Sequence, residues 1–431
     1  MPKKIAVIGG GFSGTMVIRQ LIDHGFKGTI HRFIQENSET LGPAYKNNSA
    51  PLLLNVRNQN MSAFPDDPSH FVRFLEARYP EVALPNNFVQ RSIYGHYLKT
   101  IWDETKDLSK KAEIQLQLVS TFQVDSEEYD AIVLATGNEL PRIPSGISEK
   151  VITSPFYQGN PWEIDYNSMQ HEHPIFILGN GLTMVDTVLS LRHAGFKQKI
   201  VAISTHGFNM LVHPENEILT EQVSLPVQQD LHSLVHFFNT QRKALSHTQF
   251  LLLVDSFRPI FSTWWQRFSL EEKKLFLCKF RHVWGTIRHR IPAQIAQKIN
   301  EERVSGQLVV QAGKLLTLEE NGPCAKIEYV SDNQVINGDF ACLINCTGPE
   351  TDLAKMTNPT IKELLSRQWI LPDLIRQGID IQADTHLAHG NSPMKIYAIG
   401  NLCKGTLWES TAVGELRAQA KLIAKGILES K

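Results

Sequence analysis

The chain has 431 residues, of which 42% are hydrophobic and 20% are charged. This length exceeds that of one ordinary hydrophobic core, so we expect two or three domains. The 43 basic and 44 acidic side chains leave a net charge of −1, which does not support a nucleic-acid or membrane-surface partner. No apolar run reaches the ~20 residues that cross a bilayer, and the first run is too short for a signal peptide. We therefore expect a cytoplasmic protein.

The first predicted elements are a buried strand, a glycine turn and a helix. Residues 5–8 are apolar and mostly β-branched, as in a parallel strand, and residues 16–21 continue at helical spacing. The glycines between them follow G-x-G-x-x-G, which lets the chain turn, approach a pyrophosphate and pack the helix on the strand. The free N–H groups at the helix start favour phosphate. The residues of this predicted cofactor-binding turn are Gly9, Gly11, Phe12, Ser13 and Gly14.

A carboxylate at the end of the next apolar segment supports a nucleotide site. Glu36 follows residues 30–35, at about the 20-residue distance where an acidic side chain reaches a ribose hydroxyl. The alternative is a glycine-rich turn that only packs. The turn and the carboxylate together predict a dinucleotide site.

Later segments repeat this order of strand and glycine. Residues 131–137 and 341–348 are apolar runs that end in Ala-Thr-Gly and Cys-Thr-Gly. Residues 174–181 form another strand and glycine turn, before a helix at 182–193 and a strand at 200–204. Two glycine-turn units indicate an α/β fold with two Rossmann-like dinucleotide-binding domains.

The last predicted strand, residues 396–400, belongs with the helix after it to the first domain, which is therefore discontinuous. We expect this domain to comprise residues 1–165 and 325–431, and the second domain to comprise residues 166–324. Within the second domain, residues 214–304 carry leucine, phenylalanine and tryptophan at helical spacing, which predicts a mostly helical insertion with an aromatic core.

The five cysteines do not indicate a metal or disulfide site. No C-x-x-C pair is present, the count is odd, and no histidine and cysteine cluster has metal-ligand spacing. We expect reduced thiols and no metal. Because no redox dithiol lies near the first helix, a disulfide reductase is disfavoured.

The two-domain layout resembles the flavoprotein oxidoreductases that hold FAD in one Rossmann domain and NAD(P)H in the other. The Ala-Thr-Gly run resembles their second FAD signature, and residues 396–401 resemble the strand near the flavin ribityl chain, although Asn401 replaces the usual aspartate. The last helix, with Ser410 or Thr411 as its natural N-cap, points its N-terminus at the flavin in that fold. The resemblance adds these FAD-binding residues: Met61, Ala135, Thr136, Gly137, Gly400, Asn401, Trp408, Ser410 and Thr411.

More specific motifs occur in order along the chain. Together they resemble the bacterial FAD/NAD(P)-binding oxidoreductases, whose members include proteins designated FAD-dependent urate hydroxylase. The motifs are LGPAY at 41–45, LNVR at 54–57, MSAFPDDP at 61–68, YGHYL at 94–98, GLTMVD at 181–186, RHRIP at 288–292 and LWESTAVGELR at 407–417. This resemblance implies FAD and NADPH or NADH as cofactors, with a small-molecule substrate. It leaves the identity of the substrate and the oligomeric state open.

A looser resemblance concerns the reaction with oxygen. In class B flavin monooxygenases an Asn precedes a Met/Phe/Pro/Asp run that is similar to residues 61–66, and this Asn lies over the flavin. The matching residue here is Asn55. The resemblance therefore implies a monooxygenase that uses molecular oxygen, with Asn55 in a catalytic role. The alternative is that Asn55 caps a turn.

The second glycine turn lacks the third glycine, which Met184 replaces. Because Met184 demands more space between helix and strand, we expect weaker or altered nicotinamide-nucleotide binding; the alternative is a vestigial nucleotide site. Asp186, nearby, either orients the loop or is solvated. The run 204–206 follows the next strand, where a basic residue often meets an adenosine 2′-phosphate, but it contains no Arg, so NADPH is only mildly favoured. The predicted contacts are Gly179, Gly181, Leu182, Thr183 and Ser204.

Two further residues are candidates for catalysis. Arg288, in the basic run 288–290, offers planar donors to an anionic substrate or to nucleotide phosphates; the alternative is a solvated basic helix face. Glu409 precedes the last helix and is a candidate acid or base near the flavin. His206 and His213 are weaker candidates for proton transfer.

The sequence thus predicts an FAD-dependent oxidoreductase in which NAD(P)H reduces the flavin and the reduced flavin reacts with oxygen to hydroxylate a small molecule. Two alternatives stay open. One is a reductase or oxidase that inserts no oxygen. The other is a non-catalytic flavin-binding scaffold, which the imperfect second turn allows.

Overall fold

The computed structural model describes residues 3–34, 42–45, 50–119, 129–169, 172–215, 218–220 and 223–430. The predicted ribose-binding Glu36 and the first residue of the motif at 41–45 lie outside these ranges. Within them, every helix is too short or too polar to cross a membrane. The same ranges hold no group of three or more side chains that could bind a metal ion.

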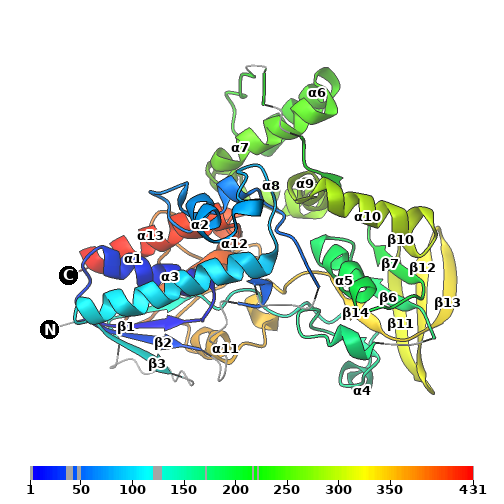
Figure 1. Ribbon diagram of the computed structural model, residues 1–431, viewed down its shortest axis with the longest axis horizontal. Helices are drawn as coiled ribbons and strands as arrows, with labels where there is room; N and C mark the ends of the chain where they lie inside the picture. The colour runs from blue at the N-terminus through cyan, green and yellow to red at the C-terminus, as the bar shows by residue number, and fades with distance from the viewer. Residues whose placement is uncertain are drawn as a thin grey trace.

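Five parallel strands form the first sheet, in the order β15-β4-β1-β2-β3 (Figure 1). The strands are β1 (Lys3–Ile8), β2 (Gly28–Phe33), β3 (Gln115–Val119), β4 (Ala131–Leu134) and β15 (Lys395–Ala398). All residues of β4 are buried, as expected for a strand covered on both faces. Since β15 pairs with β4, the two ends of the chain share one sheet.

Helices cover one face of this sheet. They are α1 (Phe12–Asp23), α2 (His70–Arg78), α3 (Arg91–Lys111) and α13 (Val413–Glu429). Their apolar side chains form one buried cluster with the inward side chains of β1 and β4. The opposite face packs against α11 (Pro359–Ser366) and the loops between 370 and 403. The carboxyl ends of β1 and β4 therefore open at a single edge of the sheet, where α1 begins.

The second sheet is also parallel, in the order β10-β7-β6-β14-β5. These strands are β5 (Tyr157–Gln158), β6 (Ile175–Leu178), β7 (Ile200–Ser204), β10 (Leu308–Ala312) and β14 (Leu343–Asn345). One face packs on α5 (Leu182–His193) and α10 (Ala293–Val304). The other packs on an antiparallel sheet made of β11 (Lys314–Asn321), β12 (Cys324–Ser331) and β13 (Gln334–Phe340), near the short helix α4 (Glu149–Ile152).

These strand pairings correct the predicted limits of the second domain. β5 precedes the predicted start at 166, and β12, β13 and β14 follow the predicted end at 324, yet all of them pack in the second domain. The domain is therefore wider on both sides than predicted. Neighbours in a parallel sheet are distant in sequence, so local patterns do not reveal which sheet a short strand joins.

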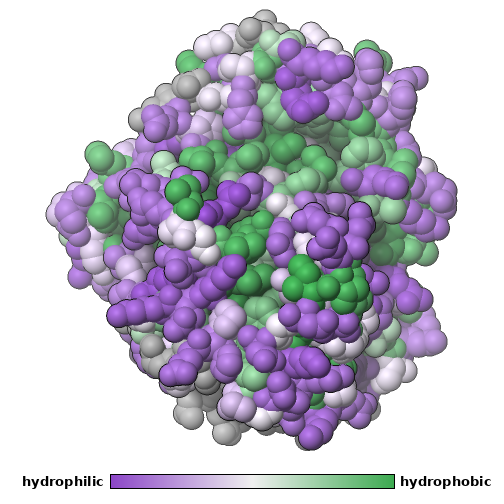
Figure 2. Space-filling view, turned by 90° about the vertical axis from the view of Figure 1, so that its right-hand side faces the viewer, coloured by the Kyte–Doolittle hydropathy of each residue, from purple (hydrophilic) through white to green (hydrophobic). Residues whose placement is uncertain are grey.

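The mostly helical insertion is confirmed and lies above both sheets in Figure 1. It contains α6 (Leu231–Ala244), α7 (His247–Arg267), α8 (Leu270–Leu275), a π-helical turn at 276–280, α9 (Arg281–Arg288) and α10. The two-residue strands β8 (Leu211–Val212) and β9 (Arg290–Ile291) pair at its base. Its predicted aromatic core is present, because Trp264, Trp265 and Trp284 are buried together. Figure 2, which views the right-hand side of Figure 1, shows mostly hydrophilic side chains with an apolar band across the upper half.

Candidate active site

The first glycine turn is built by backbone-to-backbone contact. Gly9 follows β1 with φ +129°, and a Cβ there would lie 2.1 Å from the carbonyl oxygen of Ala135. A Cβ on Gly14 would lie 2.3 Å from the carbonyl oxygen of Gly9. The N–H of Ala135 donates to the carbonyl of Ile8 at 2.9 Å. The glycine turn and the Ala-Thr-Gly run therefore interlock, and neither glycine can carry a side chain.

The N-terminus of α1 points out of this turn. Gly11 is the N-cap, and the first amide bonded within the helix is that of Thr15, to the carbonyl of Gly11 at 3.1 Å. The amides of the first turn before Thr15 therefore have no partner inside the helix. Such a helix start, without an acidic side chain in its first turn, attracts an anion. This geometry fits the pyrophosphate contact predicted for the turn.

A buried arginine that the sequence analysis missed donates hydrogen bonds to the turn and to the start of α1. Arg32 lies in β2, and its Nη2 donates to the carbonyl of Gly10 at 2.6 Å and to the hydroxyl of Thr15 at 3.0 Å. Its guanidinium lies 3.7 Å from the ring centre of Trp102. No local motif marks such a residue, because its partners come from three separate elements.

The returning C-terminal segment brings unpartnered polar groups to the same edge. Gly400 follows β15 with φ +79°, and its N–H donates to Oε1 of Gln419 at 2.9 Å, while Nε2 of Gln419 donates to the carbonyl of Ser410 at 3.0 Å. Asn401 is 6% exposed and Ser410 is 1% exposed, yet the Asn401 Nδ2 and the Ser410 Oγ have no hydrogen-bond partner among the residues that the structure describes. Leaving a buried polar atom unpaired costs about 1–3 kcal/mol. These two atoms are therefore candidates for ligand contact and fit the predicted FAD site.

Two residues predicted at the cofactor have other roles in the structure. The side chain of Met61 is 2% exposed and packs in the core of the first domain. Trp408 adopts φ +59°, and its ring packs against Trp265 at 4.9 Å and Phe276 at 5.0 Å between centroids. Both side chains therefore belong to hydrophobic cores, and their contact with the cofactor stays a prediction.

The predicted N-cap of the last helix also requires correction. α13 begins at Val413, and its N-cap is Ala412, without a side-chain hydrogen bond. Ser410 is held two residues earlier by the bond from Gln419, and Thr411 is exposed. The backbone thus enters the helix later than the hydroxyl residues predict, which leaves the Ser410 hydroxyl available to a ligand.

Glu409 and Arg288, both predicted as catalytic, lie together. Oε1 of Glu409 accepts from Nε1 of Trp284 at 2.8 Å, and Oε2 lies 3.6 Å from Nε of Arg288. The two side chains are 14% and 10% exposed, respectively, and the Arg288 Nε makes no hydrogen bond within the described part of the chain. Burial lowers the pKa of Arg288, and Glu409 opposes this shift. A buried, under-bonded guanidinium beside a carboxylate can bind an anionic group and orient a proton donor.

The rest of the basic run 288–290 is structural. Arg290 is 1% exposed, and it donates to the two carboxylate oxygens of Asp255 at 2.9 and 3.1 Å and to the carbonyl of Leu251 at 3.0 Å. Arg290 is therefore not part of a solvated helix face, whereas the Arg288 Nε is buried without a hydrogen-bond partner among the described residues.

Asn55 lies where the first domain meets the base of the insertion. Its carbonyl accepts from Nε2 of His213 at 2.9 Å, and burial lowers the pKa of His213 to about 4, so this ring is neutral at pH 7. The Asn55 side-chain amide makes no hydrogen bond to any described residue, and it is not a helix cap, because Arg57 precedes the short helix at 58–60. No hydrogen bond joins Asn55 to Arg288 or Glu409 across the described ranges.

The second glycine turn repeats the construction of the first. Gly179 has φ +105°, and a Cβ there would lie 2.4 Å from the carbonyl oxygen of Cys346, as Gly9 meets Ala135. Gly181 is the N-cap of α5, and the first amide bonded within that helix belongs to Val185. Met184 is buried in the hydrophobic core of the second domain, so its side chain lies in that core rather than in the glycine turn. The N-terminus of α5 is thus available for an anion.

Asp186 links the two domains. Its Oδ2 accepts from Nη2 of Arg91, at the start of α3, at 2.7 Å, and Arg91 also lies 5.6 Å from the ring centre of Trp162. Burial raises the pKa of Asp186, and Arg91 opposes this shift. Asp186 and Thr183 border a cavity of about 220 Å³ beside residues 161–167. Asp186 is therefore not a solvated residue, because it pairs with Arg91 of the first domain.

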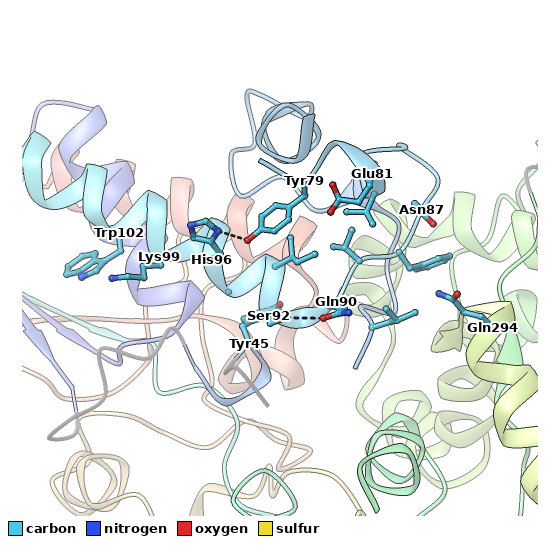
Figure 3. Close-up of a pocket in the computed structure, with 16 residues that line it drawn as sticks. Tyr45, Tyr79, Glu81, Asn87, Gln90, Ser92, His96, Lys99, Trp102 and Gln294 are labelled. Carbon is cyan, nitrogen blue, oxygen red and sulfur yellow. Dashed lines mark hydrogen bonds between the residues drawn. The ribbon is translucent and has the colours of Figure 1, made fainter. Parts of the chain in front are cut away.

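A larger pocket of about 880 Å³, which the sequence analysis did not predict, lies at the domain junction. Figure 3 shows its wall along α3, where the Tyr79 hydroxyl and Nδ1 of His96 are 2.8 Å apart, and Gln294 of α10 on the other side. Leu53, two residues before Asn55, lines it as well. The YGHYL motif was the signal for this pocket in the sequence. Its Gly95 lets the backbone of α3 lie close to the carbonyl of Tyr45, and both residues line the pocket.

Comparisons with known proteins agree with this geometry. Residues 6–140 match a family model described as FAD-NAD(P)-binding. The chain is 26% identical over 215 residues to flavin-containing monooxygenase ustF1 of Aspergillus flavus, covering 43% of this chain and 49% of that protein. It is 23% identical over 243 residues to flavin-containing monooxygenase 1 of Mus musculus, covering 48% and 41%. The chain thus spans about half the length of these curated relatives.

Solved structures share the fold over nearly the whole chain. L-lysine 6-monooxygenase from Pseudomonas syringae has a TM-score of 0.65 at 14% identity, with 99% of each chain covered. Ornithine hydroxylase from Pseudomonas aeruginosa has a TM-score of 0.64 at 13% identity, with 98% of each chain covered. A bacillithiol disulfide reductase from Staphylococcus aureus is also similar, with a TM-score of 0.55 at 9% identity and coverage of 99% and 98%. The two-dinucleotide-binding flavoprotein fold is therefore confirmed. The curated relatives support a flavin-monooxygenase-like family.

Proposed function

We propose that this protein is an FAD-dependent monooxygenase that takes reducing equivalents from a nicotinamide nucleotide and hydroxylates a small molecule. The observation that carries the proposal is the pair of similarly built glycine turns, together with the buried Asn401 Nδ2 and Ser410 Oγ, which lack partners among the described residues and follow β15 in the sheet of the first turn. The two curated relatives, both flavin-containing monooxygenases, support the reaction class.

The residues of the first turn fit FAD. The start of α1 would hold the pyrophosphate, and Asn401 and Ser410 would hydrogen-bond further along the cofactor. Glu36 stays a prediction for the ribose contact. When bound, FAD would supply hydride acceptance and oxygen activation. The protein's own contribution is to position the reactants and to exclude water.

The buried pair of Arg288 and Glu409 is proposed to act on the substrate. The guanidinium of Arg288 would bind an anionic group, and Glu409, held by Trp284, would hold or move a proton. Asn55 is proposed to present its unpaired amide to the reacting centre. Because the pocket beside α3 reaches Leu53, it offers a route towards Asn55.

Two alternatives to this proposal are a reductase or oxidase that inserts no oxygen, and a flavin-binding scaffold without turnover. The shared fold of a disulfide reductase makes a reductase conceivable, but four of the five cysteines are buried, and all five are free thiols. A non-catalytic scaffold would bind flavin without turnover. The finer similarity to urate hydroxylases is a proposal about substrate, so urate belongs in the screen.

The test begins with the purified protein. We expect a yellow protein that absorbs near ~450 nm and is bleached anaerobically by NADPH or NADH. We then expect nicotinamide consumption, in a screen that includes urate, to rise with one substrate and to label the product from ¹⁸O₂. A colourless protein that FAD cannot reconstitute would contradict the cofactor assignment. Bleaching without ¹⁸O incorporation for any substrate would favour the reductase or oxidase.

A further inference from the structure

The helical insertion brings a basic group to the nucleotide edge of the second sheet. β7 ends at Ser204, and the ring of His206 lies 4.9 Å from the ring of His282. Arg281 begins α9, and its Nε donates to Nε2 of His282 at 3.1 Å. Through His282, a guanidinium from a distant helix is therefore connected to a loop whose own sequence contains no arginine.

This loop has a fixed position relative to the second glycine turn. The side-chain amide of Asn180, inside the turn, donates to the carbonyl of Phe208. The N–H of Gly207 donates to Oγ of Ser204 at 3.0 Å, and a Cβ on Gly207 would lie 2.5 Å from the amide of Ala312. The His206 ring stacks on Phe208 with centroids 5.1 Å apart. The loop, the turn and α9 therefore form one connected surface.

Arg281 retains most of its donors for a ligand. Its side chain is exposed, and none of the carboxylates in the described part of the chain pairs with it. His282 accepts from Arg281 as a neutral ring, because burial, together with the neighbouring Arg281 and His206, lowers its pKa to about 4. A guanidinium with one donor used and no carboxylate partner favours a dianionic phosphate.

In dinucleotide-binding folds the strand after the glycine-turn helix ends beside the ribose 2′ position, and an Arg nearby accommodates the 2′-phosphate. We propose that Arg281 of the insertion is that Arg, with His206 beside it, and that the protein selects NADPH over NADH. Its use of NADPH as reductant rests on the proposed function, whereas recognition of the phosphate does not. The insertion thereby sets the nucleotide specificity.

The experiment is calorimetric titration with two probes, 2′,5′-ADP and ADP, which differ in the 2′-phosphate. We expect tighter binding of 2′,5′-ADP by the wild type, and a roughly 10- to 100-fold loss for that probe alone in Arg281→Gln. The matched control is Arg267→Gln, an exposed arginine at the end of α7, which we expect to bind both probes as the wild type does. Circular dichroism melts would verify that both variants fold.

The inference would be overturned if the wild type bound 2′,5′-ADP and ADP with equal affinity. It would also be overturned if Arg281→Gln bound 2′,5′-ADP as tightly as the wild type does. So would a wild type that binds neither probe. Anaerobic reduction of the flavin separates this inference from the proposed function. Equal reduction by NADH and NADPH would contradict the Arg281 assignment alone, whereas no reduction by either would contradict the proposed function alone.

Discussion

Replacing Gly9 with alanine tests the packing on which the first nucleotide site depends. The new Cβ would lie 2.1 Å from the carbonyl oxygen of Ala135 and 2.7 Å from its carbonyl carbon, both of them backbone atoms that cannot rotate away. The backbone at φ +129° is also a conformation that only glycine adopts readily. The substitution must therefore separate β1 from the Ala-Thr-Gly run or move the start of α1.

The structure separates the two contributions to the cost. A non-glycine residue in such a backbone region costs about 1–3 kcal/mol. Forced overpacking adds about 1–3 kcal/mol. Gly25 is the matched control, since it also has positive φ, +80°, but a Cβ there meets nothing within 4 Å. Gly25→Ala should therefore lower the free energy of unfolding by the backbone cost alone, and Gly9→Ala by roughly 2–6 kcal/mol in total.

The assay is urea unfolding of both variants, combined with the FAD content of the purified proteins. We expect Gly25→Ala to keep FAD and Gly9→Ala to lose most of it, because the displaced helix start no longer faces the pyrophosphate. Equal unfolding free energies for the two variants, with wild-type FAD content in Gly9→Ala, would refute this reasoning.

Three further predictions concern buried charged or titratable groups. Arg290→Lys should lower the free energy of unfolding by about 2 kcal/mol, because lysine cannot make the paired bonds to Asp255; denaturant titration measures it, and a neutral result would contradict the structural role. Arg91→Met and Asp186→Asn should show a coupling of about 1–2 kcal/mol in a double-mutant cycle, and additive effects would mean that the interdomain pair is not formed. Burial lowers the pKa of His386 to about 4, so between about pH 6.5 and 4 only the unfolded chain binds this proton. The free energy of unfolding therefore decreases as the pH is lowered through that window. His386→Asn, which tolerates φ +63°, should lose less stability than wild type between pH 7.5 and 5 in urea titrations; parallel losses would contradict the pKa shift.

The strands, the two glycine turns and the helices after them were predictable because each depends on neighbouring residues. Gly9 and Gly14 are required by contacts within a single strand–turn–helix unit, and the Ala-Thr-Gly run that meets Gly9 carries its own local pattern. The aromatic core of the insertion was likewise visible in its helical spacing. Local repetition therefore sufficed for the fold class.

The roles of single polar and aromatic side chains were less predictable. Trp408 was expected at the cofactor and lies in an aromatic core, because Trp265 and Phe276 reach it from the insertion. Arg290 looked as available as Arg288, and only the position of Asp255 shows that Arg290 is already paired. Sequence patterns give the chemistry of a side chain but not its neighbours.

By itself, the sequence determined that the chain has two dinucleotide-type units and a helical insertion, since apolar periodicity and glycine spacing act over a few residues. Only the tertiary structure decided which charges meet. It placed Arg288 against Glu409, Arg91 against Asp186, and His282, which Arg281 contacts, against His206. Each pairing joins segments far apart in the chain, and its strength depends on distance and burial, which folding alone sets.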